Sequence, residues 1–167
     1  MKLSIIIPTY NNLNYLIFLL NSIKTNSFYE HEIVLHINDG SDGTLDYAVK
    51  NNIRFSHSSD NIGLCSSMNK AYLLTSSNFI LYAHDDMYFC KDWDFYLVKE
   101  INKYDNYLYY LAGTNVSNRH GLINYDCGDT IDNFDRNKFE NFCINDDTPD
   151  LQSSHWAPHL IHRELWN

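Results

Sequence analysis

Short apolar runs alternate with helical patterns along the first half of the chain. Continuous runs rich in β-branched residues predict strands that are buried on both faces, and apolar positions recurring every three or four residues predict helices between them. The expected strands cover residues 3–7, 32–37, 53–56 and 79–83. The expected helices cover residues 13–23, 45–49 and 64–72. This order predicts an α/β fold, Rossmann-like, with a mostly parallel sheet flanked by helices.

Three polar loops follow the first, second and fourth expected strands, at residues 8–12, 38–44 and 84–88. Ligands of open parallel sheets bind beyond the carboxyl ends of the strands, so these loops are expected to be neighbours in space. Asn11 or Asn12 is a candidate N-cap for the first helix, and Ser41 for the second.

The pattern weakens after residue 90. A helix is expected around residues 93–101 and a strand over residues 107–112. Residues 126–150 carry eight acidic and two basic residues. This acidic stretch is interpreted either as a solvated, irregular segment or as a loop over an acceptor or metal site.

Composition restricts the class of protein. The 167 residues are 44% hydrophobic and 20% charged, which is typical of one folded domain. The net charge of -9 argues against a nucleic-acid partner, because that affinity needs clustered Lys and Arg. No run approaches the ~20 apolar residues of a transmembrane helix, and no signal sequence is recognisable. Four cysteines without zinc-module spacing favour free thiols and a cytoplasmic location, with the inner membrane face as one option.

Asp85 and Asp86 follow a buried strand and are the most informative pair of residues. Adjacent carboxylates repel each other unless a cation lies beside them, and hard oxygen ligands suit Mg²⁺ or Mn²⁺. The alternative is that one carboxylate caps the next helix while the other is solvated. Asp39 likewise either belongs to an ordinary Asp-Gly turn or accepts a hydrogen bond from a ligand N–H, with Tyr10 offering a stacking face.

Other chemistries lack their motifs. Neither GxGxxG nor GxxxxGK[ST] occurs, which argues against a dinucleotide cofactor and a P-loop. Cys65 is expected in the core. His155, His159 and His162 have helical spacing, but Pro158 argues against a regular helix there, and both structural and site roles stay open.

Four segments, in this order and spacing, resemble family 2 glycosyltransferases of the GT-A fold. They are residues 4–12 (SIIIPTYNN), 38–44 (NDGSDGT), 61–63 (NIG, with Asn69) and 82–86 (YAHDD), and residues 153–167 are similar more loosely. The resemblance implies an inverting transferase that moves a sugar from a nucleotide-diphosphate sugar to a glycan or lipid-linked hydroxyl. UDP is the expected nucleotide, because Asp39 beside Tyr10 fits a pyrimidine N–H. The resemblance also implies donor binding by Pro8, Thr9, Tyr10, Asn11, Asp39, Asn61, Gly63 and Asp85, and binding of Mn²⁺ or Mg²⁺ by Asp86 and Asp85.

Two departures from the family pattern affect this expectation. Ala83 stands where the first acid of the usual Asp-x-Asp is found. The carboxylate that serves as general base usually follows a segment resembling residues 160–167, where this chain ends. We therefore expect either a fragment that binds donor but turns over poorly, or a base recruited from Asp146, Asp147 or Asp150.

The expected division is a donor-binding part at residues 1–112 and the start of an acceptor-side part at residues 113–167, within a single domain. The competing interpretation is a non-catalytic module that binds a nucleotide sugar or a carbohydrate. A nucleotidyltransferase is less well supported, because the loop at residues 8–12 has neither Gly nor Lys.

Overall fold

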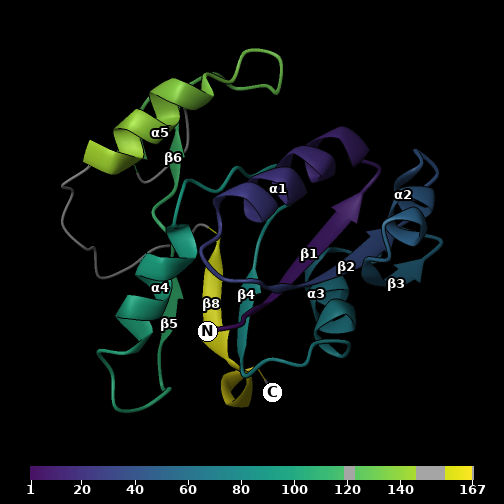
Figure 1. Ribbon diagram of the computed structural model, residues 1–167. Helices are drawn as coiled ribbons and strands as arrows, with labels where there is room; N and C mark the ends of the chain where they lie inside the picture. Colours follow the sequence, from purple (N-terminus) through teal and green to yellow (C-terminus); the bar gives the residue numbers. More distant parts are fainter. Residues whose placement is uncertain (119–122, 146–156, 167) are drawn as a thin grey trace.

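The computed structural model describes residues 1–118, 123–145 and 157–166. A six-stranded sheet with the order β3-β2-β1-β4-β8-β5 forms its centre (Figure 1). β1 to β4 are mutually parallel, while β8 is antiparallel to both of its neighbours. The strands are β1 (Ser4–Tyr10), β2 (Glu32–Asn38), β3 (Arg54–Ser58), β4 (Phe79–Tyr82), β5 (Tyr110–Ala112) and β8 (His159–His162), and the short β6 (Val116–Ser117) and β7 (Ile123–Asn124) pair separately.

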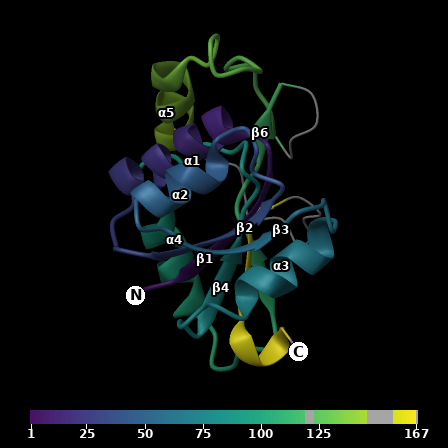
Figure 2. The same cartoon turned by 90° about the vertical axis from the view of Figure 1, so that its right-hand side faces the viewer.

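Helices cover both faces of the sheet, which confirms the predicted α/β class. Figure 2 shows α1, α2 and α4 on one side of the strands and α3 on the other. The helices are α1 (Leu13–Asn26), α2 (Thr44–Lys50), α3 (Leu64–Tyr72), α4 (Trp93–Ile101) and α5 (Arg136–Asn145), with a 3-10 turn η1 (Arg163–Leu165). Within the described ranges, no helix is both long and apolar enough to cross a membrane.

The strand prediction holds because each central strand contributes to two cores. Ile5 and Ile7 pack with Leu35 on the side of α1 and α4, while Ile6 and Val34 pack on the side of α3. All five side chains are fully buried. Burying one such side chain contributes about 1.5–3 kcal/mol, which favours apolar residues in these strands. A polar side chain inside the sheet needs a partner, as His36 in β2 has in the hydroxyls of Ser56 and Ser58.

The strand order places the carboxyl ends of β1, β2 and β4 together. β1 pairs with β2 on one side and with β4 on the other, all parallel. The strand order therefore proceeds outward from β1 on both sides, through β2 on one side and β4 on the other. A ligand crevice is expected at the carboxyl ends of the strands at such a point.

β8 joins the sheet from far along the chain. It lies between β4 and β5, with Leu160 opposite Leu81 and Leu111. The Arg163 guanidinium fixes its end by donating to Ser77 O and Thr75 Oγ1. His159 and His162 are thus on a strand and face opposite sides of it, while His155 lies outside the described residues. The division at residue 112 stays a prediction.

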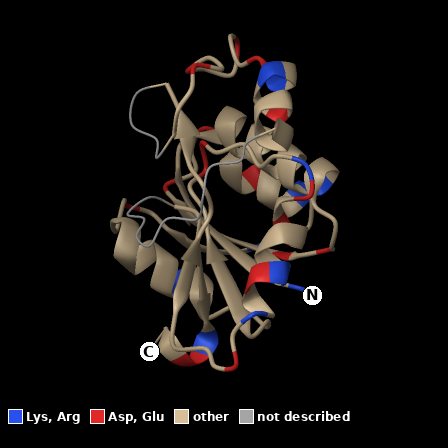
Figure 3. Cartoon of the chain, turned by 90° about the vertical axis from the view of Figure 1, so that its left-hand side faces the viewer, with Lys and Arg blue, Asp and Glu red and all other residues tan. Residues whose placement is uncertain are grey.

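The interpretation of the acidic stretch as an irregular segment is wrong for residues 136–145, which form α5. Figure 3 shows acidic residues around the start of this helix. Glu140 is not merely solvated: its carboxylate accepts hydrogen bonds from Asn26 Nδ2, Tyr88 Oη and the Lys91 amide. These bonds hold α5 to the loop that follows β4.

Two further predictions about single positions are wrong. Cys65 is exposed on α3 rather than buried in the core. Ser41 does not cap α2, because the Asp42 carboxylate accepts from the Thr44 amide instead. A carboxylate is the stronger acceptor at a helix N-terminus, where the amides have no partners within the helix.

A buried hydrogen bond between Asp94 and His31 joins α4 to the residue that precedes β2. Asp94 is fully buried and accepts hydrogen bonds from the Phe28 and Tyr29 amides and from His31 Nε2, at 2.7–2.9 Å. His31 Nδ1 accepts from the Leu3 amide, so the proton of the neutral ring lies on Nε2. Burial lowers the pKa of His31, against the opposing effect of Asp94.

We expect the protein to lose stability as the pH falls below about 6.5. The unfolded state takes up a proton on His31 near its ordinary pKa of 6.5, whereas the folded state resists it, so stability is present above that pH and declines below it. Urea unfolding at pH 7.5 and 5.5 measures the difference. His31→Gln should be less stable but should show a smaller difference between the two pH values, and an undiminished difference would contradict this account.

Candidate nucleotide-sugar site

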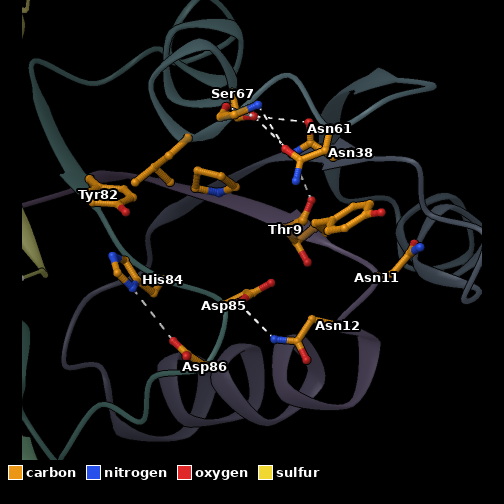
Figure 4. Close-up of a pocket in the computed structure, with 14 residues that line it drawn as sticks. Thr9, Asn11, Asn12, Asn38, Asn61, Ser67, Tyr82, His84, Asp85 and Asp86 are labelled. Carbon is orange, nitrogen blue, oxygen red and sulfur yellow. Dashed lines mark hydrogen bonds and ion pairs between the residues drawn. The ribbon is translucent and has the colours of Figure 1, made fainter.

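An open pocket of about 370 Å³ lies at the carboxyl ends of β1, β2 and β4 (Figure 4). Its volume falls in the range of small-molecule sites. It is lined by Pro8, Thr9, Tyr10, Asn11, Asn12, Asn38, Asn61, Gly63, Leu64, Ser67, Tyr82, His84, Asp85 and Asp86. Seven of the eight predicted donor-binding residues and both predicted metal ligands are therefore brought together, Asp39 being the exception.

Asn11 connects the loop after β1 to the loop after β2. Its Nδ2 donates to Asp39 Oδ2 over 2.8 Å, and its Oδ1 accepts from the Gly40 amide over 3.0 Å. Both Asn11 and Asp39 adopt positive φ angles, 46° and 59°, which Asn and Asp tolerate better than other side chains. Asp39 thus stands at the rim of the pocket, half-buried and bonded to the lining residue Asn11.

Asn12 connects the loop after β1 to the loop after β4. Its Nδ2 donates to Asp85 Oδ1 over 3.0 Å. Although Asn12 occupies the N-cap position of α1, as one of two predicted candidates, its side chain makes no capping bond. The Asp42 carboxylate accepts from the Leu13 amide instead, over 2.8 Å. Sequence reasoning missed Asn12 as a site residue because its local role as a cap looked sufficient.

Asp85 is half-buried and Asp86 is exposed. Burial raises the pKa of the Asp85 carboxyl, interactions with Thr9 and Asn12 oppose this shift, and the charge of Asp86 adds to it. The helix-cap interpretation of this pair is wrong, because the next helix, α4, begins at Trp93 with Asp92 at its N-cap. Asp86 Oδ1 lies 4.0 Å from His84 Nδ1.

The two carboxylates suit a hard divalent cation that is shared with a ligand. In the part of the chain that the structure describes, no group of three or more His, Cys, Asp or Glu side chains is placed to hold a metal alone. Mg²⁺ is commonly bound by one or two carboxylates together with substrate phosphates and water. The raised pKa of Asp85 shows that its negative charge is poorly compensated by the protein itself. The pair therefore fits a cation that arrives with a phosphate ligand.

Asn38 lines the pocket and joins the end of β2 to the start of α3. It is buried, its Nδ2 donates to Ser67 Oγ over 3.0 Å, and its Oδ1 accepts from the Ile62 amide over 3.0 Å. These bonds hold the start of α3 and the segment with Asn61 and Gly63 against β2. An Asn at the end of an apolar strand, directly before Asp39, was the signal that could have identified it.

The predicted general bases and the residues observed around the pocket do not fully coincide. Asp146, Asp147 and Asp150, the candidate general bases, lie outside the described residues. Tyr82, His84, Leu64 and Ser67 line the pocket and were not predicted as site residues.

The fold and this pocket define an α/β protein with a crevice for a ligand that spans three loops. The sequence pattern of Glycosyl transferase family 2 matches residues 4–157, and the chain belongs to that family. No curated protein sequence matches the chain.

Solved structures of S. aureus TarS are similar to the chain. TarS 1-349 in complex with UDP has a TM-score of 0.63 and 28% sequence identity, covering 73% of this chain and 38% of that one. The complex with UDP-GlcNAc has a TM-score of 0.59 and 26% identity, covering 73% and 37%. The chain therefore spans less than two fifths of the length of these TarS chains.

We expect Asn12→Ala to raise the pKa of Asp85 further. The Asn12 amide stabilises the ionised carboxylate, and its removal leaves burial and the charge of Asp86 opposed only by the weaker combination of Thr9 and His84. An NMR titration of the Asp85 side-chain carbon measures the change. Asn61→Ala is the matched control and should leave the pKa of Asp85 unchanged. The Asn61 side chain lines the same pocket, and among the described residues it accepts a hydrogen bond from the Gly63 amide rather than contacting Asp85. Equal titration in the two variants would exclude the Asn12 bond as a determinant.

Proposed function

We propose that the chain is the donor-binding part of an inverting glycosyltransferase that uses a UDP-sugar and a divalent metal ion. The observation that carries this proposal is the convergence of three loops, joined through Asn11 and Asn12, on one crevice that has two carboxylates in it. Family membership and the similarity to UDP-bound TarS support the choice of ligand.

The nucleoside is proposed to bind at the end of the pocket formed by the loop after β1. Pro8, Thr9, Tyr10 and Asn11 line this end together with Asn61 and Gly63, which face them from the start of α3. Tyr10 is 52% exposed and offers its ring for stacking. The Asp39 carboxylate, at the rim, is suited to accept the N–H of a uracil ring, and hydrogen bonds from Asn11 and Ser41 hold its pKa below the usual value.

The diphosphate is proposed to bind over Asp85 and Asp86. None of the pocket-lining residues is Lys or Arg, so the described part of the chain offers neither side chain there to an anionic diphosphate. Mn²⁺ or Mg²⁺ held by Asp86 and Asp85 would neutralise charge on the leaving diphosphate. Asn12 donates a hydrogen bond to the Asp85 carboxylate and holds it in place, and Asp85 is also proposed to bind the ribose.

In the proposed reaction an acceptor hydroxyl oxygen forms a bond to the anomeric carbon while the bond from that carbon to the diphosphate breaks. The configuration is inverted, and the proton of the hydroxyl passes to a general base. Asp146, Asp147 and Asp150 are the proposed candidates for that base, and a glycan or lipid-linked hydroxyl at the inner membrane face is the proposed acceptor.

A non-catalytic module that binds a nucleotide sugar is the competing function. Such a module would bind the donor as described but would release no UDP from it. Incubation of the protein with UDP-GlcNAc, Mn²⁺ and a range of acceptors, with UDP followed by a coupled assay, separates the two.

Asp86→Ala should abolish the metal dependence of donor binding. Asp86 is exposed, so the variant should keep its stability to within about 0.5 kcal/mol. We expect its affinity for UDP to be the same in Mn²⁺ and in chelator, whereas the unaltered protein binds at least about tenfold more tightly in Mn²⁺. Calorimetric titration measures both. Asp46→Ala, exposed on α2, is the control and should retain the dependence; a retained dependence in Asp86→Ala would remove this residue from the metal site.

Asp39→Asn should weaken UDP binding about fivefold, with metal or with chelator, because a hydrogen bond to a carboxylate is stronger than one to an amide oxygen. The substitution keeps the shape of the side chain and suits the positive φ of residue 39. Asp42→Asn is the matched control in the same loop. It should lower stability, since Asp42 accepts from the Leu13 and Thr44 amides, and leave affinity unchanged. The reverse pattern would show that Asp39 is a turn residue only.

A further inference from the structure

The hydroxyl of Tyr82 is buried without a partner. Tyr82 ends β4, and only 6% of its surface is exposed. Its ring packs with Ile80 and Ile6 on the face of the sheet that α3 covers. Among the described residues its Oη finds no hydrogen-bond partner. Buried polar groups in native proteins are nearly always paired, and an unpaired one is unfavourable, so a bound ligand that offers this hydroxyl a hydrogen bond would be favoured.

The position of Tyr82 shows where that partner would lie. Tyr82 lines the pocket, and Figure 4 shows it with His84 at the end opposite Asn11, the residue that follows Tyr10. The carboxylates of Asp85 and Asp86 lie between these two ends (Figure 4). The Tyr82 and His84 rings are 5.2 Å apart. The His84 side chain, which also lines the pocket, is 42% exposed, so the buried hydroxyl lies next to a solvent-facing residue of the pocket.

The order of chemical groups in the ligand matches the order of residues in the pocket. A nucleotide-diphosphate sugar has the nucleoside at one end, the diphosphate in the middle and the sugar at the other end. If the nucleoside binds near Tyr10 and the diphosphate over Asp86, the sugar extends toward Tyr82. This step rests on the proposed function.

The chemistry of the hydroxyl also suits a sugar. Burial, together with the charges of Asp86 and Asp85, raises the pKa of Tyr82 well above its ordinary value of 10.0. The phenol therefore stays protonated and can both donate and accept a hydrogen bond. A sugar hydroxyl has the same two capacities and carries no charge that would add to that of the carboxylates.

Ala83, the next residue along the chain, offers no polar group to a ligand in the pocket. Its side chain is fully buried and packs in the core on the other face of the sheet, with Phe89. The polar groups that β4 and the next residues direct into the pocket at this end are therefore Tyr82 and His84. We propose that the Tyr82 hydroxyl hydrogen-bonds a hydroxyl of the transferred sugar and helps to select which sugar is bound.

Tyr82→Phe tests this proposal because it removes the hydroxyl alone. Calorimetric titrations in Mn²⁺ with UDP, UDP-GlcNAc, UDP-glucose and UDP-galactose give four dissociation constants for each protein. We expect the Kd of UDP to be unchanged and the Kd of the UDP-sugar that the unaltered protein binds best to rise about three- to tenfold, the effect of one lost hydrogen bond.

Tyr88→Phe is the matched control. Tyr88 Oη donates to Glu140 and accepts from Asn26, outside the pocket. This variant should have a lower unfolding midpoint and unchanged dissociation constants. Tyr82→Phe, which removes a hydroxyl that the free protein does not use, should unfold at or above the midpoint of the unaltered protein.

Three outcomes would overturn the inference while leaving the donor site intact. Unchanged dissociation constants for all four ligands in Tyr82→Phe would mean that the hydroxyl meets only water. Equal weakening of UDP and of the UDP-sugars would mean that it contacts the diphosphate. A lowered midpoint without selective weakening would mean that it is a structural group. If the unaltered protein binds none of the four ligands, the proposed function and this inference fail together.

Discussion

The site depends on two neighbouring amide side chains that point in different directions. Asn11 and Asn12 follow the central strand, and one bonds to Asp39 in the loop after β2 while the other bonds to Asp85 in the loop after β4. Each bond joins an amide to a carboxylate, which makes it stronger than a bond between neutral groups. Three loops that are far apart in sequence are thereby held as one surface, and the first turn of α1 is left to be capped from another loop, by Asp42.

This arrangement is possible because β1 is in the middle of the sheet. Ile5, Ile6 and Ile7 in its interior are buried on both faces, and its polar side chains, Ser4 and Thr9, lie near its two ends. The polar residues are therefore concentrated where the chain leaves the core. Several of those that remain inside are paired: Asn38 bonds to Ser67 and the Ile62 amide, and Asp94 bonds to His31 and two amides. The buried hydroxyls of Tyr82 and Thr9 have no hydrogen-bond partner among the described residues, and both residues line the pocket.

The parts of the fold that were predictable are those with a local cause. The first four strands and the helices between them follow from continuous apolar runs and helical spacing, and the polar loops at their ends locate the pocket. β8 was not predictable, because its partners β4 and β5 lie about 50 to 80 residues away and nothing local indicates antiparallel pairing. α5 was hidden by its acidic surroundings. Tyr82 was missed for the opposite reason: within an apolar run it reads as a core residue, and only the unpaired Oη in the folded chain distinguishes it.

Charge is the remaining constraint on what the pocket can bind. The protein has a net charge of -9, and the crevice presents Asp85 and Asp86, with Asp39 at its rim and no Lys or Arg among its lining residues. A negative charge placed 4 Å from another costs about 4 kcal/mol at an effective dielectric constant of 20. A diphosphate would therefore be repelled by this surface unless a cation bound with it, whereas an uncharged sugar would not. Under the proposed function, the same carboxylates would make donor affinity conditional on metal, and the uncharged Tyr82 hydroxyl would help to distinguish one sugar from another.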